Sequence, residues 1–310
     1  MKKMITVMLA ILLVASLVLA GCSAKEEEKQ SLRIGVMSDL GAAPFVVAKE
    51  NGFFDKLGLD VEITVFKSAT DRDTAMQTGN LDAAMADMLT IVFYNDGAFD
   101  SKMIAATYGD YVMSSTPSLD ASALKALDQI NVGISANTVI DFATQQIAES
   151  LGVEGQVETV AIPQMPVRLE MLAAGELQAA TLPEPLASAA VLGAGEKVSG
   201  TLELGLEPGI FIATQAVIDE KSAALEKLME GYNQGVDYLN DTEQGTYIQL
   251  LIDQLGFPPT LAESFDFPTL AHATAANEAT FAKVLSWMQE RELTTSEYSY
   301  SDLNEGKFIK

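Results

Sequence analysis

The chain has 310 residues, enough for an independently stable core, and is 48% hydrophobic but only 7% aromatic. This composition favours an aliphatic α/β protein over a β-sandwich. With 43 acidic against 19 basic residues, the formal net charge is −24 at pH 7. Such a surface repels nucleic acid and anionic lipid, so we expect no nucleic-acid partner.

The first residues have the pattern of a bacterial lipoprotein signal peptide. A positive start, Met1-Lys2-Lys3, is followed by a nearly unbroken apolar run from Ile5 to Ala20. The run ends in Leu19-Ala20-Gly21-Cys22, which resembles the lipobox, and Cys22 is the only cysteine in the chain. An uncleaved membrane anchor is the alternative, but the apolar run is barely long enough to span a bilayer. We therefore expect residues 1–21 to be removed and Cys22 to carry lipid on the extracytoplasmic face of the cell membrane.

The first half of the chain alternates strand and helix patterns. Residues 22–30 are charged and lack periodicity, so we expect a flexible tether. The alternation that follows, with short loops, predicts a mainly parallel sheet covered by helices on both faces. The expected strands are 32–37, 59–66, 81–86 and 102–107, and the expected helices are 44–52, 68–79 and 89–95.

The second half repeats the pattern and then becomes helical. We expect strands at 131–135 and 157–161, a helix from 138 to 152, and a return strand at 209–214. Helical spacing follows from residue 221 onward, with further helices at 247–255 and 277–291. The predicted division is lobe 1 at 31–108 plus 210–310, and lobe 2 at 109–209.

An internal repeat supports two similar lobes. With an offset of 96 residues, Gly79 matches Gly175 and Arg72 matches Arg168, each pair within a helix–glycine–strand pattern. Chance matching in an alanine-rich chain is the alternative. We favour two α/β lobes built in series.

Motifs along both halves resemble those of a known family. They are GAAPFVVAKENGFFDKLGLDVEI (41–63), GNLDAAMAD (79–87), VGISANTVIDFATQQIAESLGV (132–153) and LAAGELQAATLPEP (172–185). In this order they resemble the solute-binding components of ABC importers, in the SsuA/THI5-like (NMT1-like) group for nitrate, sulfonate, taurine and thiamine precursors. The resemblance covers nearly all of residues 31–240.

The resemblance implies a two-lobed periplasmic-binding-protein fold of type 2. Each lobe would be a mainly parallel sheet flanked by helices, and the lobes would close on a small solute in the cleft between them. The implied partners are an ABC permease with its ATPase, and the protein would act as a monomer without a cofactor. Fungal THI5-type relatives are pyrimidine-synthesising enzymes with a cysteine-rich motif. Because no free cysteine remains after Cys22 is lipidated, we expect no enzyme.

Candidate ligand-binding residues follow from the topology. In open parallel sheets, ligands bind beyond the carboxyl ends of the strands, near free N–H groups of helix N-termini. The residues expected there are Met37, Ser38, Asp39, Ser68, Asp87, Met88, Tyr108, Ser135, Asn137, Thr138, Gln164, Met165 and Glu184.

Two carboxylates among these candidates suggest the ligand class. Asp87 and Glu184 fall one position apart in the repeat, and each would accept hydrogen bonds from a ligand N–H group. Helix capping is the alternative role for both. Met37, Met88 and Met165 would form an adaptable apolar wall, or simply fill the core. The expected ligand is a neutral or cationic heterocycle with N–H groups.

The alternative ligand is an oxyanion bound by Arg72 and Arg168. Both arginines stand at helix starts, where solvated or lobe-bridging arginines are common. His272 is the only histidine, and without a second histidine or a carboxylate cluster it predicts no metal site.

Overall fold

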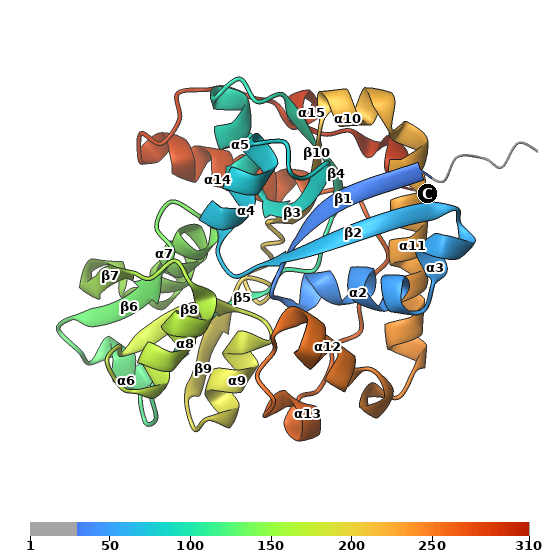
Figure 1. The fold of residues 1–310 in the computed structure, drawn as a ribbon. Helices are drawn as coiled ribbons and strands as arrows, with labels where there is room; N and C mark the ends of the chain where they lie inside the picture. Colours follow the sequence, from blue (N-terminus) through green and yellow to red (C-terminus); the bar gives the residue numbers. More distant parts are fainter. Residues whose placement is uncertain (1–29, 310) are drawn as a thin grey trace, which may run out of the picture. The chain divides into compact units, whose positions relative to one another are not determined.

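The computed structural model describes residues 30–309. The predictions for the signal peptide (1–21), the lipidated Cys22 and most of the tether (22–30) lie outside this range. Within it, two five-stranded sheets with flanking helices form two lobes, and the chain first passes from one to the other between β4 and β5 (Figure 1). No helix among residues 30–309 is long and apolar enough to cross a membrane.

The first sheet defines lobe 1 (30–106 and 209–309). It has the strand order β2-β1-β3-β10-β4. β1 is parallel to β3, with Ile34 opposite Ala83, whereas β10 is antiparallel to both β3 and β4. The strands are β1 (Gln30–Met37), β2 (Leu59–Phe66), β3 (Ala83–Asp87), β4 (Ser101–Ala106) and β10 (Gly209–Thr214).

The second sheet defines lobe 2 (111–200). Its order is β7-β6-β8-β5-β9, with β6 parallel to β7 and β8, and β5 antiparallel to β8 and β9. The strands are β5 (Tyr111–Ser115), β6 (Ile130–Ile134), β7 (Val157–Ala161), β8 (Ala179–Pro183) and β9 (Glu196–Gly200). β5 and β9 were not expected from the sequence. Each is a five-residue strand, and long-range pairing defines it: β5 pairs with β8 and β9, and β9 pairs with β5.

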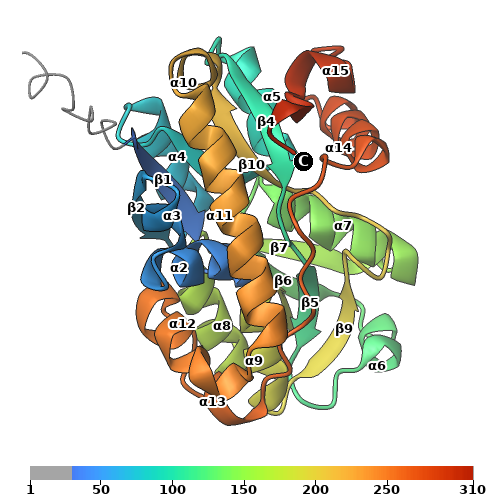
Figure 2. The same cartoon turned by 90° about the vertical axis from the view of Figure 1, so that its right-hand side faces the viewer.

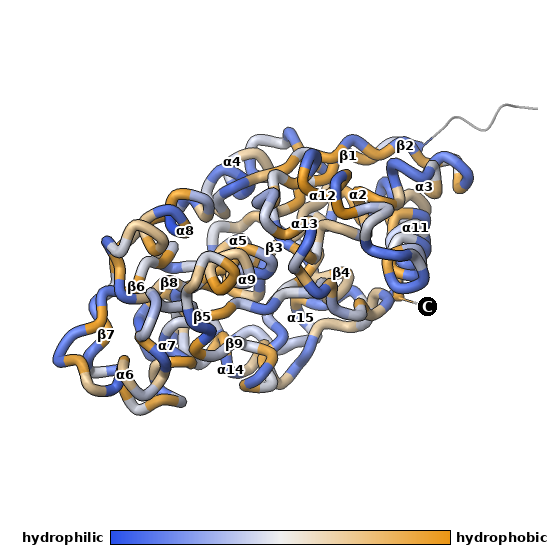
Figure 3. Tube along the Cα trace, turned by 90° about the horizontal axis from the view of Figure 1, so that it is seen from below, coloured by the Kyte–Doolittle hydropathy of each residue, from blue (hydrophilic) through white to orange (hydrophobic). Residues whose placement is uncertain are grey.

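Helices cover the sheets, and most were anticipated. In lobe 1, α14 packs on α5, and the long α11 runs beside α2 (Figure 2). Figure 3 shows both hydrophilic and hydrophobic residues on α11, and its buried residues recur at helical spacing, as expected for a helix with one buried face. The lobe 1 helices are α2 (Ala43–Glu50), α3 (Phe53–Lys56), α4 (Ala69–Gln77), α5 (Met88–Asp96), α10 (Gln215–Glu220), α11 (Ser222–Asp241), α12 (Ile248–Leu255), α13 (Leu261–Ser264), α14 (Glu278–Glu290) and α15 (Tyr300–Leu303). Those of lobe 2 are α6 (Ala121–Lys125), α7 (Val139–Leu151), α8 (Met165–Ala173) and α9 (Leu186–Leu192), and the short 3₁₀ turns are η1 (Leu40–Ala42), η2 (Glu154–Gln156), η3 (Gln244–Thr246) and η4 (Gly306–Phe308).

The sequence repeat is also a repeat in the structure. Ala83 and Ala84 of β3 pair with β1, and the residues 96 positions later, Ala179 and Ala180 of β8, pair with β6 in the same register. Gly79 and Gly175 stand at the same turn before these strands, with φ of +74° and +73°. A side chain at this left-handed conformation is strained, so glycine ends the helix in both lobes.

Two crossovers join the lobes, at residues 107–110 and 201–208. They are tied together because Asp110 Oδ1 accepts hydrogen bonds from Thr201 Oγ1 at 3.3 Å and Leu202 N at 3.1 Å. Thr201 Oγ1 also accepts from Tyr111 N at 3.0 Å. The two chain segments between the lobes therefore form one connected hinge region.

Candidate functional site

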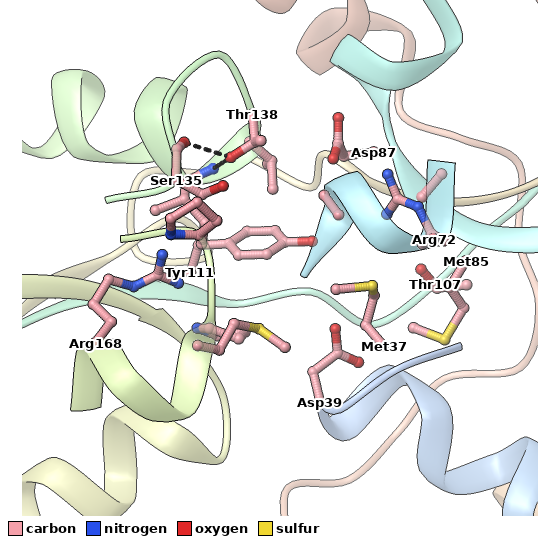
Figure 4. Close-up of a pocket in the computed structure, with 17 residues that line it drawn as sticks. Met37, Asp39, Arg72, Met85, Asp87, Thr107, Tyr111, Ser135, Thr138 and Arg168 are labelled. Atoms are coloured by element: carbon pink, nitrogen blue, oxygen red, sulfur yellow. Dashed lines mark hydrogen bonds between the residues drawn. The ribbon is translucent and has the colours of Figure 1, made fainter. Parts of the chain in front are cut away.

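The candidate site is a cavity between the two lobes, on the side where β1, β3, β6 and β8 end. The centres of water-sized molecules have about 40 Å³ of space in it. A solute bound in this closed arrangement is therefore small. The lining is Met37, Asp39, Ala69, Arg72, Met85, Ala86, Asp87 and Thr107 from lobe 1 and the first crossover, and Tyr111, Ser135, Thr138, Val139, Ile140, Pro163, Met165, Arg168 and Pro183 from lobe 2 (Figure 4).

Hydrogen bonds across the cavity rim hold the lobes together. The backbone N–H of Leu40 in lobe 1 donates to the carbonyl of Glu184 in lobe 2 at 2.9 Å, and Met165 N donates to Lys67 O at 3.1 Å. The side chain of Gln164 donates from Nε2 to Asp71 Oδ2 at 3.0 Å. The structure is thus a closed arrangement of the lobes, with the cavity enclosed by both.

Arg168 of α8 is a buried cation without a counter-charge. Its side chain is 0% exposed, Nη1 donates to the Ile162 carbonyl at 3.0 Å, and Nε and Nη2 have no hydrogen-bond partner among residues 30–309. Burial lowers the pKa of the guanidinium to about 9, so it remains charged at pH 7. Gly133 makes room for it, since a Cβ there would lie 3.0 Å from Arg168 Cγ. An anionic solute would supply the missing partner.

Arg72 holds the equivalent place in lobe 1, but its charge is compensated. Nε and Nη2 donate to Asp73 Oδ1 at 2.9 and 2.7 Å, and Nη2 also donates to Thr90 Oγ1 at 3.0 Å. Burial alone would lower the pKa of Arg72, but the charges of Asp73 and Asp87 outweigh it and raise the pKa. Arg72 therefore lines the cavity as part of a network within lobe 1.

Asp39 follows β1 and is buried with an unused acceptor. Its side-chain Oδ1 has no hydrogen-bond partner in the described part of the chain, and the residue is 7% exposed. Burial raises the pKa of its carboxyl to about 7, against the lowering effects of the N–H groups of Gly41 and Ala42 and the charge of Arg72. A donor on a solute would satisfy this oxygen.

Asp87, in contrast, caps the helix that follows it. Oδ1 accepts hydrogen bonds from Leu89 N at 3.0 Å, Thr90 N at 2.9 Å and Thr90 Oγ1 at 3.2 Å. Burial raises its pKa, while the charge of Arg72 opposes the rise. Asp87 lines the cavity, and its capping role, foreseen as the alternative, is present.

The loop before α7 brings two further candidates to the cavity wall. Thr138 is the N-cap of α7: its Oγ1 accepts from Ile140 N at 3.2 Å and donates to the Ser135 carbonyl at 2.7 Å (Figure 4). Ser135 and Thr138 line the cavity. Asn137 does not, because it occupies the left-handed turn position with φ +56° and its side chain is exposed.

Six of the thirteen candidates thus line the cavity, namely Met37, Asp39, Asp87, Ser135, Thr138 and Met165. The others lie elsewhere for identifiable reasons. Ser38 donates to the Leu255 carbonyl, Ser68 caps α4, and Met88 is fully buried in the core. Tyr108 faces a separate groove at the hinge, and Gln164 bridges the lobes at the rim.

Glu184 is also outside the cavity. It lines a surface groove with Lys197 and Phe265, and its Oε2 accepts from Ser188 N at 3.1 Å. The cis bond between Glu184 and Pro185 stands at this point of the chain. Asp87 and Glu184, the carboxylate pair expected from the repeat, therefore do not line the same cavity. Arg72 and Arg168 both line the cavity between the lobes.

Sequence reasoning missed several cavity residues. Tyr111 lies at the start of β5, an antiparallel strand that the sequence did not indicate, and burial raises the pKa of its phenol well above the ordinary value. Met85 and Thr107 join Met37 and Met165 along the wall. A place close to the carboxyl end of the expected strand 81–86 was the signal available for Met85. Residues 30–309 hold no cluster of His, Cys, Asp or Glu suited to a metal ion.

Comparison with known proteins decides the family. A model of the NMT1-like family matches residues 25–251. The chain belongs to the NMT1-like family. No curated protein matches this NMT1-like chain at significant sequence similarity.

Solved structures similar to the NMT1-like chain have the periplasmic-binding-protein fold. The ligand-binding component of an ABC-type import system from Staphylococcus aureus, with zinc bound, has a TM-score of 0.75 at 12% identity, covering 90% of this chain and 97% of that one. The aliphatic sulphonate-binding protein SsuA from Escherichia coli has a TM-score of 0.73 at 16% identity, covering 89% and 97%. The nitrate-binding protein NrtA from Synechocystis PCC 6803 has a TM-score of 0.61 at 16% identity, covering 74% and 68%. These likenesses confirm the expected two-lobed fold.

Proposed function

We propose that this protein is the solute-binding component of an ABC importer. It captures a small solute that carries an anionic group, closes its two lobes around it, and presents the closed form to a permease driven by an ATPase. Cys22 anchors it to the extracytoplasmic face of the cell membrane through lipid. No covalent chemistry is involved, and the chain's only cysteine is the lipidated one.

The observation that carries this proposal is Arg168. A guanidinium with no exposed surface and two nitrogen groups without partners is unfavourable in a protein interior. Its position in the wall of a cavity between two lobes makes it ready for an acceptor that arrives with a solute. An anion there gains charge-assisted hydrogen bonds and removes the uncompensated charge.

The acidic candidates give less support to a cationic heterocycle. Asp87 Oδ1 is engaged by the first turn of α5, and Glu184 lies in a different groove. Arg72 adds positive potential to the same wall, although Asp73 balances its charge. We therefore favour the anionic alternative over the neutral or cationic ligand that the sequence suggested. That the sulphonate- and nitrate-binding proteins named above share the fold agrees with this choice.

The lobes close because the solute binds the closed form more tightly than the open form. A solute that contacts both lobes stabilises the closed form by the difference between its binding free energies for the two forms. The rim bonds, from Leu40 to Glu184 and from Met165 to Lys67, add to the closed form but not to the open one. Release to the permease then requires that these bonds break.

The test is closure on binding. Protein refolded from denaturant to remove bound solute should become more compact in X-ray scattering when an anionic solute is added. At a solute concentration a hundredfold above Kd, unfolding should cost about 2.7 kcal/mol more. Trp287 of α14 in lobe 1 lies edge-on to Phe142 of α7 in lobe 2, with 5.6 Å between the ring centroids. The fluorescence of Trp287 should therefore also report the movement of lobe 2.

The matched control is Arg168→Met, which should lose both the compaction and the stabilisation. A solute that binds tightly while the radius and the Trp287 fluorescence stay unchanged would rule out a hinge-closing receptor.

A further inference from the structure

The cavity holds a second buried group whose hydrogen-bonding capacity is unused, in the other lobe. Within the described part of the chain, two nitrogens of Arg168 in lobe 2 and Oδ1 of Asp39 in lobe 1 have no hydrogen-bond partner. Both residues line the cavity and are more than nine-tenths buried. Figure 4 shows them on separate walls, Arg168 on α8 and Asp39 in the loop after β1.

The two groups do not satisfy one another. No salt bridge or hydrogen bond joins them, and the cation whose charge acts on Asp39 is Arg72 rather than Arg168. The closed arrangement therefore contains one buried donor site and one buried acceptor site, each without a partner among residues 30–309. Such groups lose their water on closure and are stabilised only by a solute that replaces it.

Resting on the proposed function, we propose that the solute is two-ended: an acid whose anionic group pairs with Arg168 and whose N–H group donates to Asp39. Asp39 is then the residue that sets specificity. A plain oxyanion satisfies Arg168 but leaves the Asp39 carboxyl buried and unpaired, so the closed form is penalised. A plain amine leaves Arg168 unpaired in the same way.

The remaining wall fits the middle of such a solute. Met37, Met85 and Met165 provide flexible apolar contact between the two polar walls. The small cavity volume limits the connecting body to a few atoms. Because the anionic end contacts lobe 2 and the donor end contacts lobe 1, one small molecule links both lobes only if it carries both groups.

Pairs of acids that are similar in shape, of which only the first carries an N–H donor, test this proposal. We would titrate solute-free wild type by calorimetry with pyrrole-2-carboxylate against furan-2-carboxylate, β-alanine against butanoate, and taurine against propane-1-sulfonate. In each pair the second compound keeps the acid but loses the N–H group. Leaving a buried acceptor unpaired should weaken binding of the second compound by about tenfold to a hundredfold.

Two variants complete the experiment. Asp39→Asn should reduce the preference within each pair, because a neutral amide oxygen is a weaker acceptor of the N–H group than a carboxylate is. Glu184→Gln changes a carboxylate outside the cavity in the same way and should keep the preference. Comparison of the pairs on wild type needs no variant, so the proposal stays testable even if Asp39→Asn folds poorly.

The outcomes separate this inference from the proposed function. If acids without a donor bind wild type as tightly as the matched acids with one and close the lobes, the receptor function stands and the two-ended solute is wrong. A preference that persists unchanged in Asp39→Asn would equally refute the role of Asp39. If no acid of either kind binds, the proposed function fails and this inference fails with it.

Discussion

Arg72 and Arg168 occupy equivalent positions of the two lobes, and replacing each by methionine should affect stability in opposite directions. Arg168 has no counter-charge among residues 30–309, and burial lowers the pKa of its guanidinium from the ordinary value to about 9. This lowering of the pKa corresponds to about 5 kcal/mol of unfavourable free energy for the charged form. Because both the folded and the unfolded pKa lie above 7, the whole penalty is present at pH 7. It is relieved only as the pH rises above about 9.

Arg168→Met should therefore stabilise the solute-free protein. Methionine fills part of the same space, but it loses the hydrogen bond from Nη1 to Ile162. The expected gain is accordingly smaller than the full penalty, about 1–4 kcal/mol, as for other buried charges replaced by apolar side chains.

Arg72→Met should do the reverse. It removes the partner of Asp73 and the positive charge beside the buried Asp87. Breaking a buried ion pair typically destabilises by about 3–5 kcal/mol. We expect the low end of that range, because the Asp73 side chain is 29% exposed.

Equilibrium urea unfolding of solute-free protein at pH 7 measures both effects, with unchanged m-values as the sign that the unfolding reaction is the same. If Arg168→Met destabilises the protein as much as Arg72→Met does, Arg168 is a structural residue with an internal partner. The argument for an anion site would then lose its basis.

Two further predictions concern other parts of the chain. Cys22→Ala should shift the protein from the membrane fraction to the soluble fraction, because stable anchoring requires the attached lipid; a variant that stays processed and membrane-bound would contradict the lipoprotein assignment. Burial raises the pKa of the Asp39 carboxyl from 3.8 to about 7, so between these pH values the folded state keeps a proton that the unfolded state loses. For solute-free wild type, the contribution of Asp39 to the free energy of unfolding should therefore fall by about 4 kcal/mol as the pH rises from about 4 to about 7. Asp39→Asn should remove this part of the pH dependence, and identical pH profiles for unfolding of wild type and variant would show that the carboxyl is not desolvated.

Much of the fold could be predicted because its signals are local. Strand patterns at 59–66, 157–161 and 209–214 agree with the structure residue for residue. Capping by Ser68 and Thr138 follows from side chains that bond their own helix starts. The two short strands β5 and β9 were missed, because they are defined by pairing with strands of lobe 2 that are distant in the chain, β5 with β8 and β9 with β5.

The sequence by itself determined the family, the two α/β lobes and the edge of each sheet where a ligand would bind. Only the tertiary structure decided which polar residues face the cavity and which of their charges are balanced. Arg72 and Arg168 are equivalent in the repeat, yet Asp73 and Thr90 pair with one while the other has only a backbone carbonyl. Part of that difference is local, because Asp73 follows Arg72 directly whereas Leu169 follows Arg168. The contact with Thr90, the burial of both side chains and their place in the cavity wall depend on residues distant in the chain, and no local pattern records them.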